Sequence, residues 1–484
     1  MHEIINISIS HRSNHLTTQF YNNKEKLLYT EDRPNTVDVF LNGTKDLISK
    51  TASYSPRALL WDSKLGNGSL GTFQYSESND YYDPNKENLK EVGESLVVTH
   101  PRIQKSIYQE ALDSGAPVPK LGINNSRYWS DYSHLIYNSK SLQNLNSWYH
   151  DVENPNLPDF EKLGQQKFQN YETGFQEFSD NYVSDFFDIN LHYQLEQCDS
   201  LQGFNLITDV DNAWGGFSTA VLQELKNELP KSNVFTWTFN EDDALNGKTM
   251  KERAITKQSL SRITQKLKAS INLIEESDLF IPLYADPKLT NWELSSKICK
   301  IFDAVNSVFD QNNVEQVRSM EYLVNCISDG TNDQNIISNI TESHNEDEIY
   351  SYFPLINKFD LKSKVSYHEF SNCDIIRESN NNETLYENEK DKNNNDRIHL
   401  RTLKTYRYFP SDTISDEYKS NNDSNITLAS TEVCRNVFKH WNHIVTKYFR
   451  NDTDREQLKE DISSRAAAYE YGWYDDEDSG DDDY

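Results

Sequence analysis

The hydrophobic positions of the chain change their period along its length, and each change marks an expected element. Ile5, Ile7 and Ile9 recur at every second residue, which predicts a strand that begins almost at residue one. A polar turn should follow, and then a helix that ends near Phe20 and Tyr21. The chain therefore opens with a strand followed by a helix.

From about residue 175 the pattern becomes regular. Apolar side chains then recur at steps of three and four residues, which predicts a helix with one apolar face. Further strands are expected at 57–61, 203–207, 233–239 and 279–284, and further helices at about 216–228, 257–275 and 291–309. Strands that alternate with helices predict an α/β fold built on a doubly wound parallel sheet.

Several segments depart from this pattern. Residues 74–95 are polar and look like a loop or an insertion, whereas residues 379–398 and 419–425 are rich in Asn, Asp, Glu and Lys, a composition that predicts disorder. Helical periodicity returns at 431–449 and again at about 454–469. The expected regions are an N-terminal domain at 1–310 with an insertion at about 74–170, an intermediate region at 311–430 with a low-complexity insert at about 375–428, C-terminal helices at 431–473, and a disordered acidic tail at 474–484.

The charge balance excludes some partners. The 484 residues carry a formal net charge of −29, and a general nucleic-acid binder needs clustered Lys and Arg instead. The same charge disfavours adsorption to anionic lipid. It either keeps the protein in solution or, through the acidic tail, attracts basic protein partners. Direct nucleic-acid binding is therefore not expected.

Targeting and redox features are few. The N-terminus has neither a signal peptide nor an Arg-rich leader, and no apolar run is long enough to span a membrane. The five cysteines are far apart in the sequence, so neither a zinc knuckle nor a disulfide framework is expected. A reduced intracellular compartment is the simplest interpretation.

Three patterns in the sequence are candidates for chemical sites. Residues 66–71 fit the spacing GxGxxG, but the polar residues after them do not form the helix that a dinucleotide fingerprint needs. His11 and His15, like His440 and His443, could share one face of a helix, but neither pair has a visible third ligand. No catalytic group and no metal site is therefore predicted.

The remaining candidate is the turn between the strand at 203–207 and the next helix. In doubly wound folds such a turn binds phosphate through backbone N–H groups. Gly215 and Gly216 would allow a close backbone approach. Against this, Asp209 and Asp211 would repel a phosphate, and Trp214 is bulky.

Three segments resemble tubulins. Residues 198–204 (CDSLQGF) look like the tubulin segment that leads into a glycine-rich phosphate loop, and counting onward places that loop at 211–217, where only Gly215 is kept. Residues 56–62 (PRALLWD), with the later Gly66, are similar to a second tubulin segment. The tubulin-like framework is therefore recognisable, although the phosphate loop has changed.

The N-terminal strand and helix are the third such segment. They keep Asn14 and Phe20, but Ser10 and Ser13 stand where tubulins have Gly. Residues 128–132 (YWSDY) resemble a Trp-Ser-Asp element of the Misato family, for which tubulins have no counterpart. We therefore identify the chain as similar to the Misato family.

The resemblance implies a tubulin-like fold and a role in partitioning mitochondria and inheriting mitochondrial DNA, with a location at the mitochondrion, peripheral or on its cytoplasmic face. Because the phosphate loop is altered, we expect a non-enzymatic protein without a cofactor. The alternative is a divergent GTP-binding protein in which a Mg²⁺ ion bridges the two aspartates of the turn. Its vestigial nucleotide site would comprise Asn14, Asp62, Gly215, Gly216, Ser218 and Thr219.

Overall fold

A computed structural model gives the fold of the chain. It describes residues 2–31, 33–45, 52–73, 103–151, 158–161, 166–241, 257–328, 333–343, 348–356, 367–378, 399–419, 425–449 and 455–472. The polar segment at 74–95, the low-complexity segment at 379–398 and the acidic tail at 474–484 lie outside the described residues.

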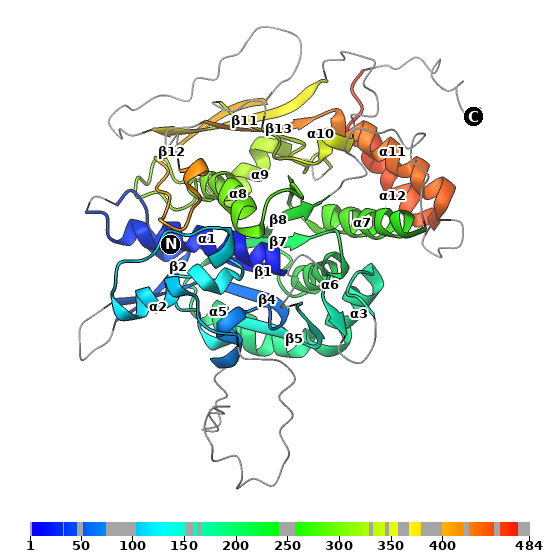
Figure 1. Cartoon of the computed structure of the whole chain (residues 1–484). Coiled ribbons are helices and arrows are strands. Elements are labelled where there is room, and N and C mark those ends of the chain that lie inside the picture. The colour runs from blue at the N-terminus through cyan, green and yellow to red at the C-terminus, as the bar shows by residue number, and fades with distance from the viewer. Residues whose placement is uncertain are drawn as a thin grey trace, which may run out of the picture.

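A seven-stranded sheet forms the centre of the protein (Figure 1). Its strands lie in the order β6-β5-β4-β1-β7-β8-β9, and neighbours run parallel except for β5 and β6. They are β6 (Phe160–Glu161), β5 (Leu142–Tyr149), β4 (Ala58–Lys64), β1 (Glu3–Ile9), β7 (Leu201–Asp209), β8 (Asn233–Asn240) and β9 (Leu279–Tyr284). The α/β prediction is confirmed, with one antiparallel strand at the edge.

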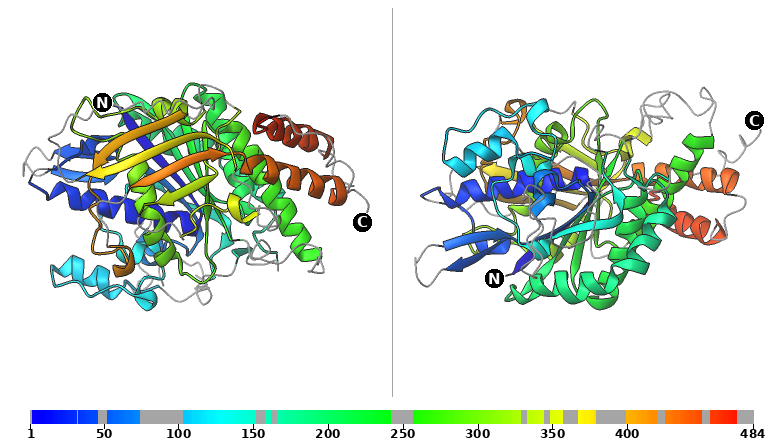
Figure 2. Two further views of the ribbon diagram at one scale, coloured as in Figure 1. Left: turned by 90° about the horizontal axis from the view of Figure 1, so that it is seen from above. Right: turned by 60° about the horizontal axis from the view of Figure 1, so that its bottom comes forward.

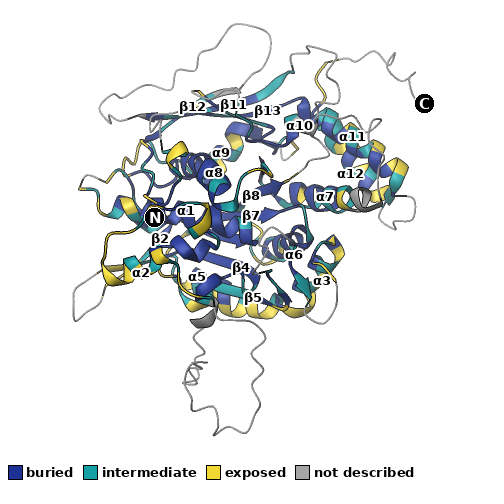
Figure 3. Ribbon diagram, viewed as in Figure 1, coloured by how far each residue is buried: buried dark blue, intermediate teal, exposed yellow. Residues whose placement is uncertain are grey.

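Helices cover both faces of this sheet, which is why the central strands are buried on both sides. One face packs against α1 (His11–Leu28), α8 (Asn291–Asn306) and α9 (Met320–Ser328), and the other against α3 (Tyr171–Asn181), α6 (Ala213–Glu228) and α7 (Lys257–Glu276). The predicted two-residue period of β1 is visible in this packing, because Ile5, Ile7 and Ile9 all belong to the core between the sheet and helices α3, α6 and α7. Figure 3 shows the central strands as buried and much of α3 as exposed.

A second, four-stranded sheet lies over α8 and α9 (Figures 1 and 2). Its order is β10-β13-β11-β12. The strands are β10 (Asn339–Glu342), β13 (Ile426–Thr431), β11 (Glu369–Glu378) and β12 (His399–Tyr406). The sequence pattern did not predict this sheet. Strand β12 lies inside the expected low-complexity insert at about 375–428.

The predicted C-terminal helices are confirmed as α11 (Val433–Tyr448) and α12 (Arg455–Ala468), which pack together and against α7. The remaining elements are short: β2 (Leu41–Lys45), β3 (Ala52–Pro56), α2 (Ile107–Ser114), α4 (Val183–Asp185), α5 (His192–Glu196), α10 (Phe353–Ile356), η1 (Val37–Val39), η2 (Gly68–Phe73), η4 (Ile123–Asn125), η5 (Trp129–Tyr132), η6 (Ser139–Ser141), η7 (Phe186–Leu191) and η9 (Asp416–Tyr418). Among the helices described, none is both long enough and apolar enough to cross a membrane.

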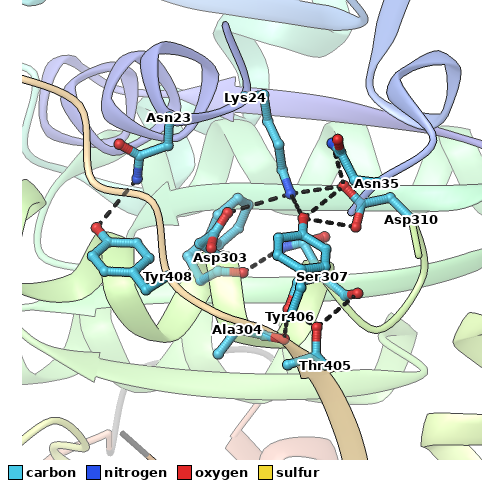
Figure 4. Close-up of polar contacts among 12 residues, drawn as sticks. Asn23, Lys24, Asn35, Asp303, Ala304, Ser307, Asp310, Thr405, Tyr406 and Tyr408 are labelled. Atoms are coloured by element: carbon cyan, nitrogen blue, oxygen red, sulfur yellow. Dashed lines mark hydrogen bonds and ion pairs between the residues drawn. The ribbon is translucent and has the colours of Figure 1, made fainter. Parts of the chain in front are cut away.

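A buried polar network joins α1 to the second sheet (Figure 4). The Lys24 ammonium donates to Asp310 Oδ2 at 2.8 Å and to the Tyr406 hydroxyl at 2.7 Å, and it lies 3.3 Å from Asp303 Oδ1. Arg377 of β11 donates to the other oxygen of Asp303 at 3.0 Å. Helices α1 and α8 are thus connected to the second sheet by buried charge as well as by apolar packing.

Candidate functional site

The candidate site lies where the strand order reverses. The chain passes from β1 outward through β4 and β5 on one side, and then returns to β7 on the other side of β1. In open α/β sheets ligands bind at such a point, outside the carboxyl ends of the strands. Here β1 leads into α1 and β7 leads into α6, on opposite faces of the sheet.

Helix α6 begins earlier than the sequence pattern predicted. It begins at Ala213 instead of about residue 216, because Asn212 is its N-cap and accepts a hydrogen bond from Trp214 N–H at 3.0 Å. Gly215 and Gly216 therefore lie within the first turn of the helix and not in a loop before it. Glycines inside a helix need another explanation than backbone freedom.

That explanation is close helix packing. A Cβ added to Gly215 would lie 2.8 Å from the Cβ of Ala269 on α7, and one added to Gly216 would overlap Tyr171 O and lie 3.0 Å from Phe175 N on α3. Both contacts are closer than side chains permit. The two glycines let α7 and α3 press against the start of α6.

The segment before α3 covers the N-terminus of α6. Phe168 O accepts from Ala213 N–H at 3.4 Å, and the Phe168 ring packs against the Trp214 indole, 5.1 Å between centroids. Trp214 also donates its Nε1–H to Asp159 Oδ2 at 3.2 Å. The backbone donors that would hold a phosphate at this end are therefore occupied by the chain itself.

Arg12 closes the crevice between α1 and α6. Its guanidinium lies 3.4 Å from Asp209 Oδ1 and 3.5 Å from Asp211 Oδ2, and it donates to Glu241 Oε1 at 2.6 Å. Lys266 of α7 pairs with Asp211 Oδ1 at 3.0 Å. Burial would lower the pKa of Arg12, but the three carboxylates outweigh it and raise that pKa. Arg12 and Lys266 together thus balance the charges of Asp209 and Asp211.

These residues do not fit a nucleotide phosphate. Asp209 and Asp211 stand at the position that the tubulin resemblance assigns to phosphate, and like charges repel strongly where water is excluded. Burial raises the pKa of Asp209 to about 6, and Arg12 opposes that shift. A phosphate would have to displace both Arg12 and the covering segment at 168–174.

The other two sequence-predicted residues of α6 also face inward. Ser218 Oγ contacts Thr208 Oγ1 of β7, and Thr219 Oγ1 donates to Gly215 O at 2.9 Å within the helix. Both side chains are fully buried. The structure therefore places four of the predicted residues together on α6, where they pack against other parts of the chain: Gly215, Gly216, Ser218 and Thr219.

Asn14 and Asp62 form a separate pair on the α1 side. Asn14 Nδ2 donates to Trp61 O at 2.9 Å and to Asp62 Oδ2 at 3.2 Å. Ser10, the N-cap of α1, has φ 129° and ψ 158°, a conformation that essentially only glycine adopts without strain. The backbone at the β1–α1 turn thus has a glycine-type conformation, although its residue is Ser.

The Trp-Ser-Asp element covers Asp62. Trp129 of η5 is fully buried and donates Nε1–H to Asp62 Oδ2 at 3.3 Å, while Asp131 Oδ2 accepts from Tyr128 N–H at 2.8 Å. Burial would raise the pKa of Asp62, but His11 beside it outweighs this effect and lowers that pKa. The element thus closes the α1 side of the site.

Asp131 gives this element a predicted pH dependence. Burial raises the pKa of Asp131 to about 6, above roughly 3.9 for an unfolded chain. Between about pH 4 and 6 the unfolded state releases this proton first, so the folded state loses stability as pH rises. We expect Asp131→Asn to remove this loss, so that the variant gains about 1 kcal/mol relative to the parent chain between about pH 5 and 7 in urea unfolding. A difference in unfolding free energy between variant and parent that stays constant from about pH 5 to 7 would contradict the raised pKa of Asp131.

The comparisons with known proteins agree with this architecture. Residues 2–114 match the Misato Segment II tubulin-like domain, and residues 118–308 match a tubulin domain. Protein DML1 of Kluyveromyces lactis is 44% identical over 490 residues, which cover 99% of each chain. The chain belongs to the Misato/DML1 family. Protein DML1 of Eremothecium gossypii is 41% identical over the full length of both chains, and protein dml1 of Aspergillus oryzae is 24% identical over 99% of this chain.

The resemblance to the Misato family is thus confirmed. The sequence indicated Asp209, Asp211 and Trp214 as obstacles to phosphate, but not the cations that pair with the two aspartates, which are Arg12 and Lys266. For Arg12, a charged residue three positions after the last Ile of β1 was the available signal. The residues that cover α6 carry no such signal, because they lie about 45 residues before it.

Proposed function

We propose that this Misato/DML1-family chain is a non-enzymatic tubulin-like protein that acts in the partitioning of mitochondria and the inheritance of mitochondrial DNA. The observation that carries the non-enzymatic part is the Arg12 bridge to Asp209 and Asp211 across the crevice at the β1–β7 switch point. The mitochondrial part rests on the family. In this proposal the chain associates with the mitochondrion through protein partners.

Energetics support a closed crevice. Removing one partner from a buried ion pair costs about 3–5 kcal/mol, because the other charge is left unpaired. A nucleotide that displaced Arg12 would incur this cost at Asp209 and would also place phosphate beside two carboxylates. Binding energy from the base and ribose would have to exceed both the cost of the unpaired Asp209 and the repulsion between phosphate and the carboxylates.

The proposed mode of action is binding to protein partners. With a net charge of −29, the chain would attract basic partners over a range set by salt. Tubulin-like packing around the closed crevice would then provide a rigid frame that presents the binding surfaces. In this scheme the family keeps the framework and does without nucleotide turnover.

Replacing Thr219 by Val tests the non-enzymatic proposal in cells. The Thr219 hydroxyl donates to Gly215 O inside α6, so an isosteric apolar residue should cost no more than about 1 kcal/mol of stability. We expect cells that depend on Thr219→Val to transmit mitochondrial DNA as well as cells with the parent chain. The measurement is the fraction of daughter cells that lack mitochondrial DNA after the native copy is switched off.

The controls separate the two parts of the proposal. Switching off the native copy without replacement should raise that fraction, and an unchanged fraction would contradict the mitochondrial role. Thr44→Val, on the exposed end of β2, is a matched control for the substitution. If Thr219→Val fails to transmit mitochondrial DNA at normal protein level while Thr44→Val succeeds, a phosphate-contacting role for Thr219 is favoured instead.

A further inference from the structure

Two buried histidines and a buried aspartate meet at the carboxyl ends of β4 and β5. His11 begins α1, Asp62 lies in β4 and His150 follows β5. One nitrogen of each imidazole and one oxygen of Asp62 all lie within 4.8 Å of one another, and all three residues are buried. Three segments distant in the sequence therefore bring metal-binding groups to one point.

His150 is oriented with a lone pair available. Its Nδ1 lies 3.1 Å from Asp159 Oδ1, and a carboxylate can only accept, so Nδ1 carries a proton and the neutral imidazole has its lone pair on Nε2. The His150 side chain is only 2% exposed, yet Nε2 has no hydrogen-bond partner among the described residues. A buried imidazole nitrogen without a partner costs stability unless something binds it.

Each of the three groups also has an outer partner. Asp159 holds His150, His15 Nε2 lies 3.3 Å from His11 Nε2, and Ser63 N–H donates to Asp62 Oδ1 at 2.9 Å. Metal-bound histidines almost always have such a partner on the second ring nitrogen, because it fixes the tautomer and the orientation of the ring. This arrangement was not visible as a site in the sequence, where only the spacing of His11 and His15 stood out.

The local charge favours a cation. His11 Nδ1 lies 3.0 Å from Asp62 Oδ2, so the imidazole donates Nδ1–H to the carboxylate, and a metal ion could replace that proton. Asp62 and Asp159 together carry the two negative charges that would balance a divalent ion. The His11 and His150 rings lie 4.3 Å apart at 28°, and two protonated rings would repel each other there.

We propose that His11 Nδ1, a carboxylate oxygen of Asp62 and His150 Nε2 bind one divalent transition-metal ion of the Zn²⁺ class. Two imidazoles and one carboxylate suit Zn²⁺ and its neighbours, whereas Mg²⁺ and Ca²⁺ prefer oxygen ligands alone. A tetrahedral Zn²⁺ ion needs ligand atoms about 3.3 Å apart. The distance of 3.0 Å between His11 Nδ1 and Asp62 Oδ2 is close to this value, and the third ligand atom lies within 4.8 Å of both. A fourth position would remain for water or an exchangeable ligand. The ion would join α1, β4 and the segment after β5, and this site lies beyond the proposed function.

The test uses the untagged full-length chain. It is stripped with a chelator, dialysed against Zn²⁺ and analysed for metal by mass spectrometry, with affinity measured by calorimetry. We expect one Zn²⁺ per chain, a rise in melting temperature on loading, and visible d–d bands on substitution with Co²⁺. His150→Gln should abolish tight binding, and Asp159→Asn, which leaves all three ligands in place, should weaken it about 10–100-fold.

Matched variants distinguish this site from adventitious binding. His192→Gln changes an exposed histidine of α5 and should bind Zn²⁺ like the parent chain. If His150→Gln fails to fold, Asp159→Asn serves as the test. The proposal is overturned if the stripped chain takes up no Zn²⁺, or if His150→Gln and Asp159→Asn bind it as tightly as the His192→Gln control.

Discussion

Replacing Lys24 by Met is expected to lower the free energy of unfolding by about 3–5 kcal/mol. Lys24 is 1% exposed and is the shared cation of Asp303 and Asp310. Burial would lower the pKa of Lys24, but the two carboxylates outweigh it and raise that pKa. Met has a similar volume, so the expected loss comes from the unpaired Asp310 carboxylate and not from a cavity. Asp303 keeps its ion pair with Arg377.

Chemical unfolding near neutral pH measures this loss. Lys26→Met, two residues along the same helix, removes an exposed lysine and should cost less than about 1 kcal/mol. The loss in Lys24→Met should shrink at lower pH, because burial already raises the pKa of Asp310 and protonation would remove its unpaired charge. Equal effects of the two substitutions would show that the network in Figure 4 contributes little to stability.

Replacing Gly174 by Ala is expected to destabilise the chain by about 3 kcal/mol or more, although Ala is the better helix former by about 1 kcal/mol. An added Cβ would overlap Ala213 O and lie 2.7 Å from Ala213 C and 2.9 Å from Phe217 N. These are backbone atoms of α6, so no side chain can move aside to make room. Helices α3 and α6 would have to separate.

Thermal or urea unfolding checks this expectation. Gly122→Ala is the matched control, because an added Cβ there would meet only Asn125 Oδ1, at 3.8 Å. We expect the control to change the free energy of unfolding by about 0.5 kcal/mol or less. A Gly174→Ala variant as stable as the control would mean that α3 does not press on α6, which would weaken the case for a covered α6 N-terminus.

Much of the central fold could be predicted from the sequence. Strands such as 203–207 and 279–284 alternate with helices along the chain, and this alternation indicated a parallel sheet, since parallel neighbours need a crossover connection. The second sheet was missed because its strands are joined by long polar segments, and because β10 and β12 show no sustained alternation. Their burial depends on packing against α8 and α9, which local periodicity does not encode.

The sequence predicted where the candidate site lies, but not all of the residues that meet there. The turn after β7 and its two aspartates were visible, whereas Arg12, which pairs with both, comes from α1, about 200 residues earlier. In the same way, His11 was noticed only with His15. Asp62 and His150 join it through the ends of β4 and β5, and no spacing rule connects residues so far apart.

We expect the folded full-length chain to bind neither GTP nor GDP, because its own residues close the crevice where tubulin-like proteins would hold nucleotide. Calorimetric titration of the chain with each nucleotide in the presence of Mg²⁺ tests this expectation. The heats should not differ from those of dilution for either nucleotide. Saturable binding in the micromolar range, above all with release of phosphate from GTP, would contradict it.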